Sequence, residues 1–360
     1  MSRTLTALRV LAGPAARQHL RERGLRPQDV RVVPGAAGGP KGLALNRLDR
    51  FLFAHWLPRG GHVVHLVGAS VGAWRMVAAC LPDADRALAR LADDYVAADY
   101  SRAGTRRPDA RSVSEDFAAT LRAHFAGHEA TLLAHPAWRL HIVASRGRHI
   151  LRREGRFTTP VGFMTAFAAN AVARQALGGW LERVVFSDTR DELPLPLTDF
   201  RTHRVALSTD NLLPAVMASC SIPFWMKAVH DIPGAPAGAY WDGGITDYHL
   251  HWRYDQLQPG LALYPHFQAA VVPGWLDKAL RHRHRPTAAL DRLVVLAPRP
   301  EWVATLPDRK LPDRGDFQRY GTNLQARQKA WRNAVAEGQR LADEFAELVG
   351  SGVPIEADGL

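Results

Sequence analysis

The stretch LVGASVGAW, Leu66 to Trp74, places a serine between two glycines at the end of a short apolar run. The run at 62–67 predicts a buried strand, and the pattern from Val71 to about Cys80 predicts a helix. A strand that turns sharply into a helix through Gly-x-Ser-x-Gly is typical of α/β folds that expose the serine at the edge of a sheet. Ser70 is therefore a candidate nucleophile. The pattern also fits a packing turn in which Ser70 caps the next helix.

A second glycine-rich stretch, PGAAGGPKG at 34–42, follows a predicted strand at 29–33. Such a loop exposes backbone N–H groups that can bind a phosphate or an oxyanion. A nucleotide P-loop requires Ser or Thr after Gly-Lys, but Gly42 follows Lys41, and the glycines lack the G-x-G-x-x-G spacing of a dinucleotide loop. An oxyanion hole and a purely structural turn remain. Because Pro40 has no N–H, the candidate oxyanion donors are Gly38, Gly39 and Lys41.

The third stretch, YWDGGITD at 240–247, ends a predicted strand with Asp242. Asp-Gly is a common turn pair, so the dipeptide alone indicates little. A carboxylate beside apolar Trp241 is expected to be partly desolvated, which raises its pKa and makes it a better base. Asp242 is therefore a candidate partner for Ser70.

In this order the three stretches resemble the patatin-like phospholipases, a family of acyl hydrolases. The matching motifs are AGGPKG at 37–42, GASVG at 68–72 and DGG at 242–244, and MASCSIPFW at 217–225 resembles the segment that the family carries between elbow and aspartate. The resemblance extends over about 29–247.

That resemblance implies a three-layer α/β/α fold with a central, mostly parallel sheet and a Ser70–Asp242 dyad that needs no histidine. The glycine loop would form the oxyanion hole, and the reaction would be hydrolysis of lipid carboxylic esters without metal or cofactor. The glycines that would support the elbow and the aspartate are Gly68, Gly72, Gly243 and Gly244.

The chain departs from the family pattern in three places. Ala37 stands where the oxyanion loop has its first glycine, and Lys41 replaces the usual arginine, which keeps the charge but not the fork of donors. The text after DGG is ITDYH rather than a continuation with asparagine and proline. These departures concern loop geometry and substrate preference more than the dyad.

Three other interpretations are weighed against this one. An α/β-hydrolase triad would recruit a histidine after Asp242, with His249, His251 and His266 as candidates. The pairs His249-x-His251 and His282-x-His284 suggest a metal site only weakly, because the chain has 16 histidines. A non-catalytic, basic lipid-binding protein on the same scaffold would need neither Ser70 nor Asp242.

The 360 residues, alternating between strand-like and helix-like patterns, predict an α/β protein. We expect a helical segment at 1–28, a hydrolase domain at 29–300 with a helical insertion at about 83–135, and a helical extension at 301–360. The insertion carries a basic loop at 101–112. The extension is expected to hold one long helix from Tyr320 to Leu348 and a mobile tail.

The formal net charge of +11 favours anionic partners, although 41 of the 46 basic residues are arginine, a skew that codon bias also explains. The best basic cluster is KALRHRHR at 278–285, and no RNA-binding aromatic motif accompanies it, so no nucleic acid is expected. Peripheral contact with an anionic membrane surface remains open, through the apolar stretch at 161–181. Ordinary core packing is the alternative for that stretch.

The chain is expected to be cytoplasmic. Its first residues do not form a convincing signal peptide, because Arg9 interrupts a short apolar stretch, and no apolar run is long enough to span a membrane. Cys80 and Cys220 are far apart in sequence, so a disulfide framework is not expected.

Overall fold

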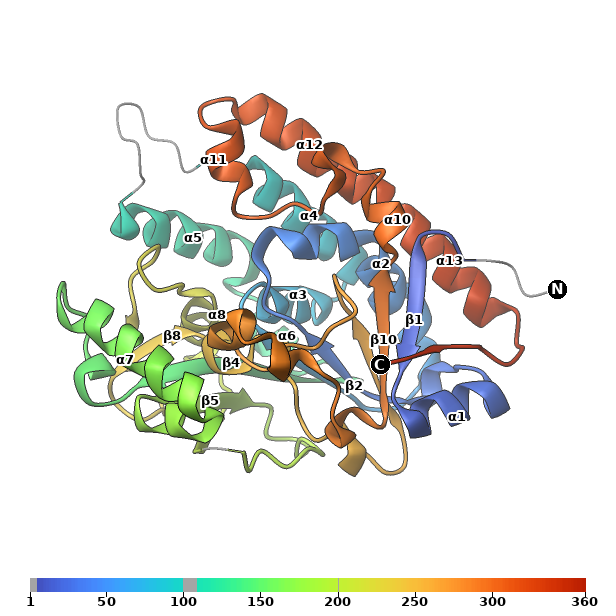
Figure 1. The fold of residues 1–360 in the computed structure, drawn as a ribbon, viewed down its shortest axis with the longest axis horizontal. Coiled ribbons are helices and arrows are strands. Elements are labelled where there is room, and N and C mark those ends of the chain that lie inside the picture. The colour runs from blue at the N-terminus through green and yellow to red at the C-terminus, as the bar shows by residue number, and fades with distance from the viewer. Residues whose placement is uncertain (1–4, 100–108, 200) are drawn as a thin grey trace.

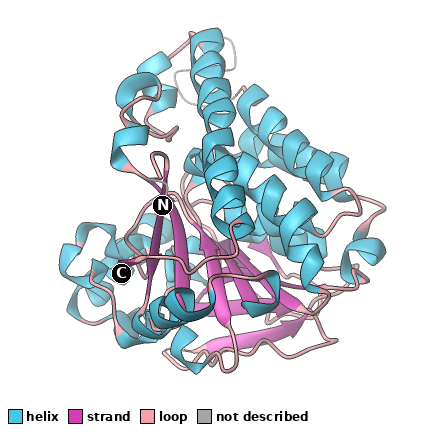
Figure 2. Cartoon of the chain, turned by 90° about the vertical axis from the view of Figure 1, so that its right-hand side faces the viewer, coloured by secondary structure: helices cyan, strands magenta, loops and turns pink. Residues whose placement is uncertain are grey.

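The polypeptide is built around one large, mostly parallel sheet with helices on both sides (Figures 1 and 2). The computed structural model describes residues 5–99, 109–199 and 201–360. Along the sheet the strand order is β11-β1-β10-β9-β2-β3-β4-β5-β6, and β8 pairs with β4 and with β7 off this path. The expected three-layer α/β/α fold is confirmed.

The strands are β1 Leu8–Ala12, β2 Val30–Gly35, β3 Val64–Ala69, β4 Trp138–Gly147, β5 Leu181–Ser187, β6 Thr202–Ala206, β7 Val229–His230, β8 Ala239–Asp242, β9 Leu261–Pro265, β10 Leu293–Pro298 and β11 Asp358–Gly359. The α-helices are α1 Pro14–Arg23, α2 Asn46–Arg50, α3 Val71–Ala79, α4 Ala84–Ala97, α5 Ala110–Phe125, α6 Glu129–Leu133, α7 Thr158–Val172, α8 Leu212–Cys220, α9 Gly244–Asp247, α10 Pro300–Val303, α11 Asp316–Tyr320, α12 Leu324–Glu337 and α13 Gln339–Gly350. Short 3₁₀ turns connect many of them.

The central strands are buried on both faces, which explains their continuous apolar sequences. Every residue of β3 and of β10 is buried, as parallel strands covered by helices require. Strands β2 and β3 run in parallel, with Gly35 opposite Gly68 at their carboxyl ends. Loops that leave this edge therefore emerge side by side, which is where open α/β sheets usually bind ligands.

Glycines allow α3 to pass very close to the end of β2. A Cβ atom on Gly72 would lie 1.9 Å from the carbonyl oxygen of Gly35, and one on Gly68 would lie 2.5 Å from the backbone nitrogen of Ala73. Neither position leaves room for a side chain. The two glycines of Gly-x-Ser-x-Gly are thus required by the approach of helix to strand.

The chain ends differ from the sequence-based expectation. Segment 1–28 contains the expected helix α1 and, in addition, strand β1, which pairs antiparallel with β10. The expectation of a mobile tail is wrong. Strand β11 pairs with β1, Ile355 is buried, and its N–H donates to the carbonyl of Leu20 at 2.9 Å. The tail is held because it covers the otherwise open edge of β1.

The expected long helix at 320–348 is also wrong, because it is two helices, α12 and α13, which meet at Gly338. A Cβ atom there would lie 2.5 Å from the carbonyl oxygen of Ala44, so the junction leaves no room for a side chain. In α13, Phe345 packs edge-on against Trp56 with ring centroids 5.2 Å apart.

The insertion at 83–135 is helical as expected, with α4, α5 and α6. Of its basic loop, residues 101–108 lie outside the described part of the chain, and α5 begins at Ala110. The stretch at 161–181 divides into most of α7 and a 3₁₀ turn at Arg174–Gly179. Strand β7 has only two residues, Val229 and His230, and pairs with β8. Cys80 and Cys220 are buried free thiols.

Replacement of Gly72 by alanine tests the close approach of α3 to β2. We expect Gly72→Ala to lower the free energy of unfolding by about 3 kcal/mol or more, because two backbones must separate. Gly350→Ala is the control, since no atom lies within 4 Å of its Cβ position. Urea unfolding of both variants is the measurement. Equal stability of the two variants would contradict the packing described here.

Candidate active site

Ser70 occupies a strained turn between β3 and α3. It follows the last residue of β3 directly, and it is the N-cap of α3, with φ 56° and ψ −131°. A positive φ is uncommon for a residue with a side chain and is typical of a nucleophile elbow. The expected role as a side-chain cap is not observed, because the Ser70 hydroxyl makes no cap hydrogen bond to α3. Its hydroxyl is directed elsewhere.

That hydroxyl donates a hydrogen bond of 2.6 Å to Oδ2 of Asp242, the last residue of β8. The second carboxylate oxygen, Oδ1, accepts from the N–H of Gly244 at 2.7 Å. Ser70 is only 4% exposed and Asp242 only 6%. The structure therefore brings together the two residues that the sequence proposed as partners, although 172 positions separate them.

Burial raises the pKa of Asp242 to about 6, because the charged form loses its hydration. The hydrogen bond from Ser70, the positive charge of Arg314 and the N–H of Gly244 oppose this effect. At neutral pH the carboxylate is still ionised, and it is much more basic than an exposed aspartate. Such a shift is what a general base that works near pH 7 requires.

Ser219 bonds to the segments that carry Ser70 and Asp242. Its hydroxyl accepts the N–H of Ser70 at 2.9 Å and donates to the carbonyl of Val143 at 2.6 Å. Its own carbonyl accepts the N–H of Gly243 at 3.1 Å. We identified the segment MASCSIPFW from the sequence but assigned no role to Ser219. Its position inside that segment is the signal that could have found it.

The glycine loop faces the same place. The N–H of Ala37 is used, since it donates to the carbonyl of Tyr248 at 2.9 Å. The N–H groups of Gly38 and Gly39 have no acceptor within the described ranges. Gly39 has φ +57°, and a Cβ atom on Gly38 would lie 2.3 Å from the ring of Phe267. These two positions therefore require glycine and leave two donors available.

Ala37 fits in the loop because its neighbour lacks a side chain. The Cβ of Ala37 lies 2.5 Å from the position that a Cβ on Gly244 would occupy. The departure from the family pattern at Ala37 is accommodated by the second glycine of DGG.

A cavity of about 260 Å³ opens at Ser70 and Asp242. It has an apolar side, from the IPFW segment and the residues after DGG, and a charged side. The apolar side is formed by Ile222, Pro223, Ile245 and Trp275. The charged side is formed by Lys41, Lys278, Asp313 and Arg314.

The histidines proposed for a triad lie elsewhere. Within the described residues no hydrogen bond of Ser70 or Asp242 involves a histidine. His249 accepts the N–H of Val272 at 2.9 Å, His266 is fully buried beside it, and His251 contacts Thr287. Burial lowers the pKa of His249 and of His266.

The hypothesis of a metal site has no support from side-chain geometry. In 5–99, 109–199 and 201–360 no three His, Cys, Asp or Glu side chains are grouped so that they could hold a metal ion. The His284 ring contacts the carbonyl of Asp277. Across the same ranges, none of the helices combines the length and the apolar character that crossing a bilayer requires.

Comparison with known proteins agrees with this arrangement. No curated protein matches the sequence. The model of one family, described as patatin-like phospholipase, matches residues 38–249, a span that begins in the glycine loop and ends just after the DGG motif. Because that span is more than half of the 360 residues, the chain belongs to the patatin-like phospholipase family.

Proposed function

We propose that this protein is a serine acyl hydrolase that cleaves carboxylic esters of lipids, with Ser70 as nucleophile and Asp242 as general base. The observation that carries the proposal is the 2.6 Å hydrogen bond from a serine in a strained elbow to a buried carboxylate of raised pKa. Nucleophilic catalysis by serine needs these two groups in contact. Family membership supports ester-linked lipids as the substrate class.

In the first half of the reaction Asp242 takes the proton of Ser70 Oγ as the oxygen attacks the ester carbonyl carbon. The negative charge that develops on the carbonyl oxygen is stabilised by the N–H groups of Gly38 and Gly39, each donor contributing about 3–4 kcal/mol. Protonated Asp242 then gives its proton to the departing alcohol oxygen. The acyl group remains on Ser70.

Water completes the cycle. Asp242 accepts a proton from a water molecule that attacks the acyl carbon, and the proton returns to Ser70 Oγ as the acyl bond breaks. Lys41 belongs to the same loop, but its N–H is a weaker candidate donor to the oxyanion. The 3₁₀ turn Gly39–Leu45 has Gly38 as N-cap, and the first hydrogen bond of such a turn uses the N–H of the third residue after the N-cap, which is Lys41.

The apolar side of the cavity suits an acyl chain. Ile222, Pro223, Ile245 and Trp275 all line it. When an alkyl chain packs against these residues, burial of apolar surface favours binding by about 25 cal/mol per Å² removed from water.

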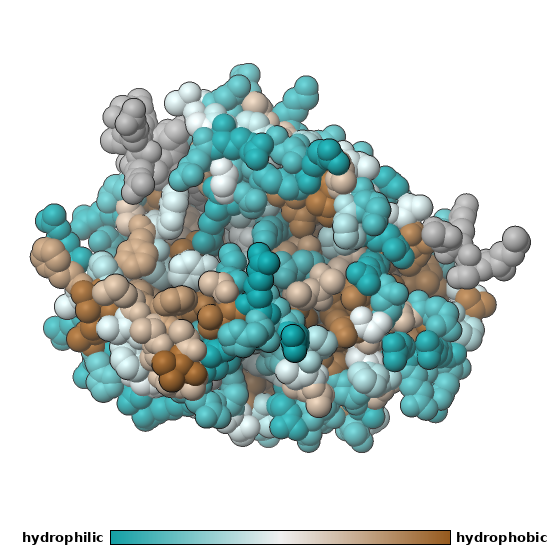
Figure 3. Space-filling view, in the orientation of Figure 1, coloured by the Kyte–Doolittle hydropathy of each residue, from teal (hydrophilic) through white to brown (hydrophobic). Residues whose placement is uncertain are grey.

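We also propose that α7 contacts an anionic membrane during the reaction. Its outer side carries large apolar residues that are mostly exposed to solvent. The exposed fraction is 65% for Met164 and 86% for Val172, and it is 77% for Phe157, just before the helix. Apolar atoms gather over α7 in Figure 3. An exposed apolar patch of this kind is typical of a surface that contacts a membrane or another protein.

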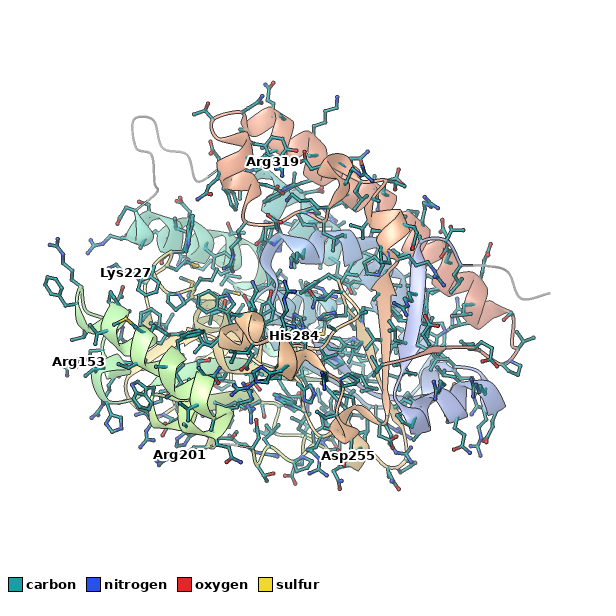
Figure 4. The ribbon with its side chains drawn as sticks, viewed as in Figure 1. Arg153, Arg201, Lys227, Asp255, His284 and Arg319 are labelled. Atoms are coloured by element: carbon teal, nitrogen blue, oxygen red, sulfur yellow. The ribbon has the colours of Figure 1, made fainter. Side chains whose placement is uncertain are left out.

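A ring contact connects α7 with the segment that lines the cavity. The ring of Phe163, on the buried side of α7, lies 5.8 Å from that of exposed Phe224, and the preceding residue, Pro223, lines the cavity. Basic residues surround the patch: Arg152, Arg153, Arg156 and Lys227 are all exposed (Figure 4 labels two of them). Each basic residue near an anionic lipid surface contributes about 1 kcal/mol.

Loss of either dyad residue should abolish ester hydrolysis. We expect Ser70→Ala and Asp242→Asn to lower kcat/KM on a lipid ester by at least about 10³-fold, with a folded protein by circular dichroism. A fluorophosphonate probe should label the wild type and not Ser70→Ala. His251→Gln and His266→Gln are controls that should retain activity. A folded histidine variant as inactive as Asp242→Asn would establish a triad, and absence of Ser70 labelling would favour a lipid-binding protein.

The raised pKa of Asp242 has a consequence for stability. Between pH 4 and pH 6 the unfolded chain loses this proton more readily than the folded chain, so the ionised carboxylate destabilises the fold increasingly as pH rises. Relative to the wild type, Asp242→Asn should therefore gain about 2 kcal/mol of unfolding free energy between pH 4 and pH 8. Denaturant unfolding at both pH values measures this, with exposed Asp210→Asn as control. A constant difference would contradict a raised pKa.

Acidic substitutions on α7 should impair membrane binding. We expect Val172→Glu combined with Met164→Glu to weaken association with phosphatidylglycerol vesicles by at least about tenfold, because apolar area is lost and negative charge is added. Val353→Glu is the control, since Val353 is also an exposed valine but lies in the C-terminal tail. Co-sedimentation measures binding, and thermal unfolding checks folding. An equal loss of vesicle binding in Val353→Glu would contradict the proposal that α7 contacts the membrane.

A further inference from the structure

Three basic side chains meet at the charged side of the cavity, each from a different part of the chain. Lys41 belongs to the glycine loop, Lys278 to the 3₁₀ turn Trp275–Ala279, and Arg314 to the loop that precedes α11. Lys278 and Arg314 lie outside residues 38–249, the part that matches the family. Membership of the family alone therefore does not predict them.

None of the three forms an ion pair with a carboxylate in the described part of the chain. Lys41 Nζ lies 5.1 Å from the ring centroid of Phe267, and Lys278 Nζ lies 5.3 Å from that of Tyr248. The guanidinium of Arg314 faces the oxyanion loop, with Nε 3.4 Å from the Cβ position of Gly39. These contacts orient the cations but do not neutralise them.

Elsewhere in the interior this chain pairs its arginines. Arg75 bonds to Asp49 at 2.7 Å and Arg183 to Asp247 at 2.6 Å, both with two nitrogen atoms. At the cavity, Lys41 and Arg314 are half-buried and Lys278 is exposed, so at least two cations are partly removed from water without a paired carboxylate among the described residues. They cost free energy through repulsion and lost hydration unless an anion joins them.

The nearby carboxylates do not supply that anion. Asp313 also lines the cavity, but it accepts from Lys310 Nζ at 3.0 Å, and Asp242 is engaged by Ser70. Burial lowers the pKa of Lys41, and neighbouring Lys310 lowers it further while Asp313 opposes this. Burial also lowers the pKa of Lys278, followed by the charges of Lys41 and Arg314. The cavity wall thus has an excess of positive charge.

We propose that Lys41, Lys278 and Arg314 form a subsite for the phosphate group of an acyl ester substrate, beside the ester that Ser70 attacks. The proposal deepens the proposed function and rests on it, because the phosphate and the ester belong to one ligand. Two ammonium groups and a planar guanidinium suit the several acceptor oxygens of a phosphate. A doubly charged phosphate monoester balances the excess charge better than a carboxylate does.

The C-terminal part of the chain holds Arg314 in place. Lys310 bridges Asp313 and Asp316, and the buried carboxylate of Asp316 accepts the indole N–H of Trp331 in α12 at 2.8 Å. The loop is thus anchored to a helix outside the matched region. The extension supplies a specificity residue to the cavity.

A pair of soluble substrates isolates the phosphate. Hexanoylglycerol 3-phosphate and hexanoylglycerol, both below their micelle concentrations, differ only in that group. We expect the wild type to prefer the phosphorylated ester in kcat/KM by at least about tenfold. Arg314→Gln and Lys278→Gln should each reduce this preference by about tenfold, chiefly through KM, because a charge-assisted contact is lost.

Two controls make the result specific. Arg332→Gln removes the same charge from an exposed position on α12 and should leave the preference unchanged. Arg314→Lys should restore part of the preference, as a positive charge requires. Unchanged preference in both Arg314→Gln and Lys278→Gln would overturn the subsite, as would an equal effect of Arg332→Gln.

Further measurements separate this proposal from the others. Hydrolysis of p-nitrophenyl butyrate and its loss in Ser70→Ala report on the dyad alone, so the subsite can fail while the proposed function stands. Inorganic phosphate should inhibit the wild type competitively and Arg314→Gln more weakly. A preference for phosphate seen only with vesicles, and not with soluble esters, would assign it to the membrane contact and overturn the subsite.

Discussion

The site depends on how β4 pairs with two other strands. Strand β3 ends with Ala69 opposite Val143 of β4, and β8 ends with Asp242 opposite Ala144. Strand β5 pairs with the other edge of β4. Strand β8 therefore pairs with the same edge as β3, directly after the point where β3 ends. Ser70 and Asp242 therefore meet at two adjacent residues of one strand, and Ser219 bonds to the carbonyl of the first of them. The hydrogen bond between Ser70 and Asp242 is a consequence of sheet register.

Several features of this site cost stability. Ser70 has a positive φ, the carboxylate of Asp242 is buried with a raised pKa, and three cations line one cavity with no ion-pair partner among the described residues. Each is tolerated because its surroundings leave no alternative, as the glycine contacts at Gly72 and Gly244 illustrate. Strain and desolvation are concentrated where charge must develop during ester cleavage.

The motifs and the buried strands were predictable because their signals are local. The glycine loop, the elbow and DGG each combine a strand with residues that a sharp turn requires, and the apolar runs of β2, β3 and β10 indicate burial. Strand β9, with five residues, and β1 and β11 escaped prediction, since short strands are defined mainly by the neighbours with which they pair. The break at Gly338 depends on contact with Ala44, which is distant in sequence. Ser219 and Arg314 acquire their places only through tertiary structure.

The basic residues that give the net charge of +11 lie in different environments. Many arginines form internal ion pairs, such as Arg183 with Asp247. The exposed cations around α7 lie in water, where salt screens them within about 8–10 Å. At the cavity, Lys41 and Arg314 are half-buried and are screened less than exposed charges, so they act on a group held against them rather than on a distant surface. The basic residues thus divide into structural pairs, the exposed cations of the proposed membrane contact and the cavity cations of the proposed phosphate subsite.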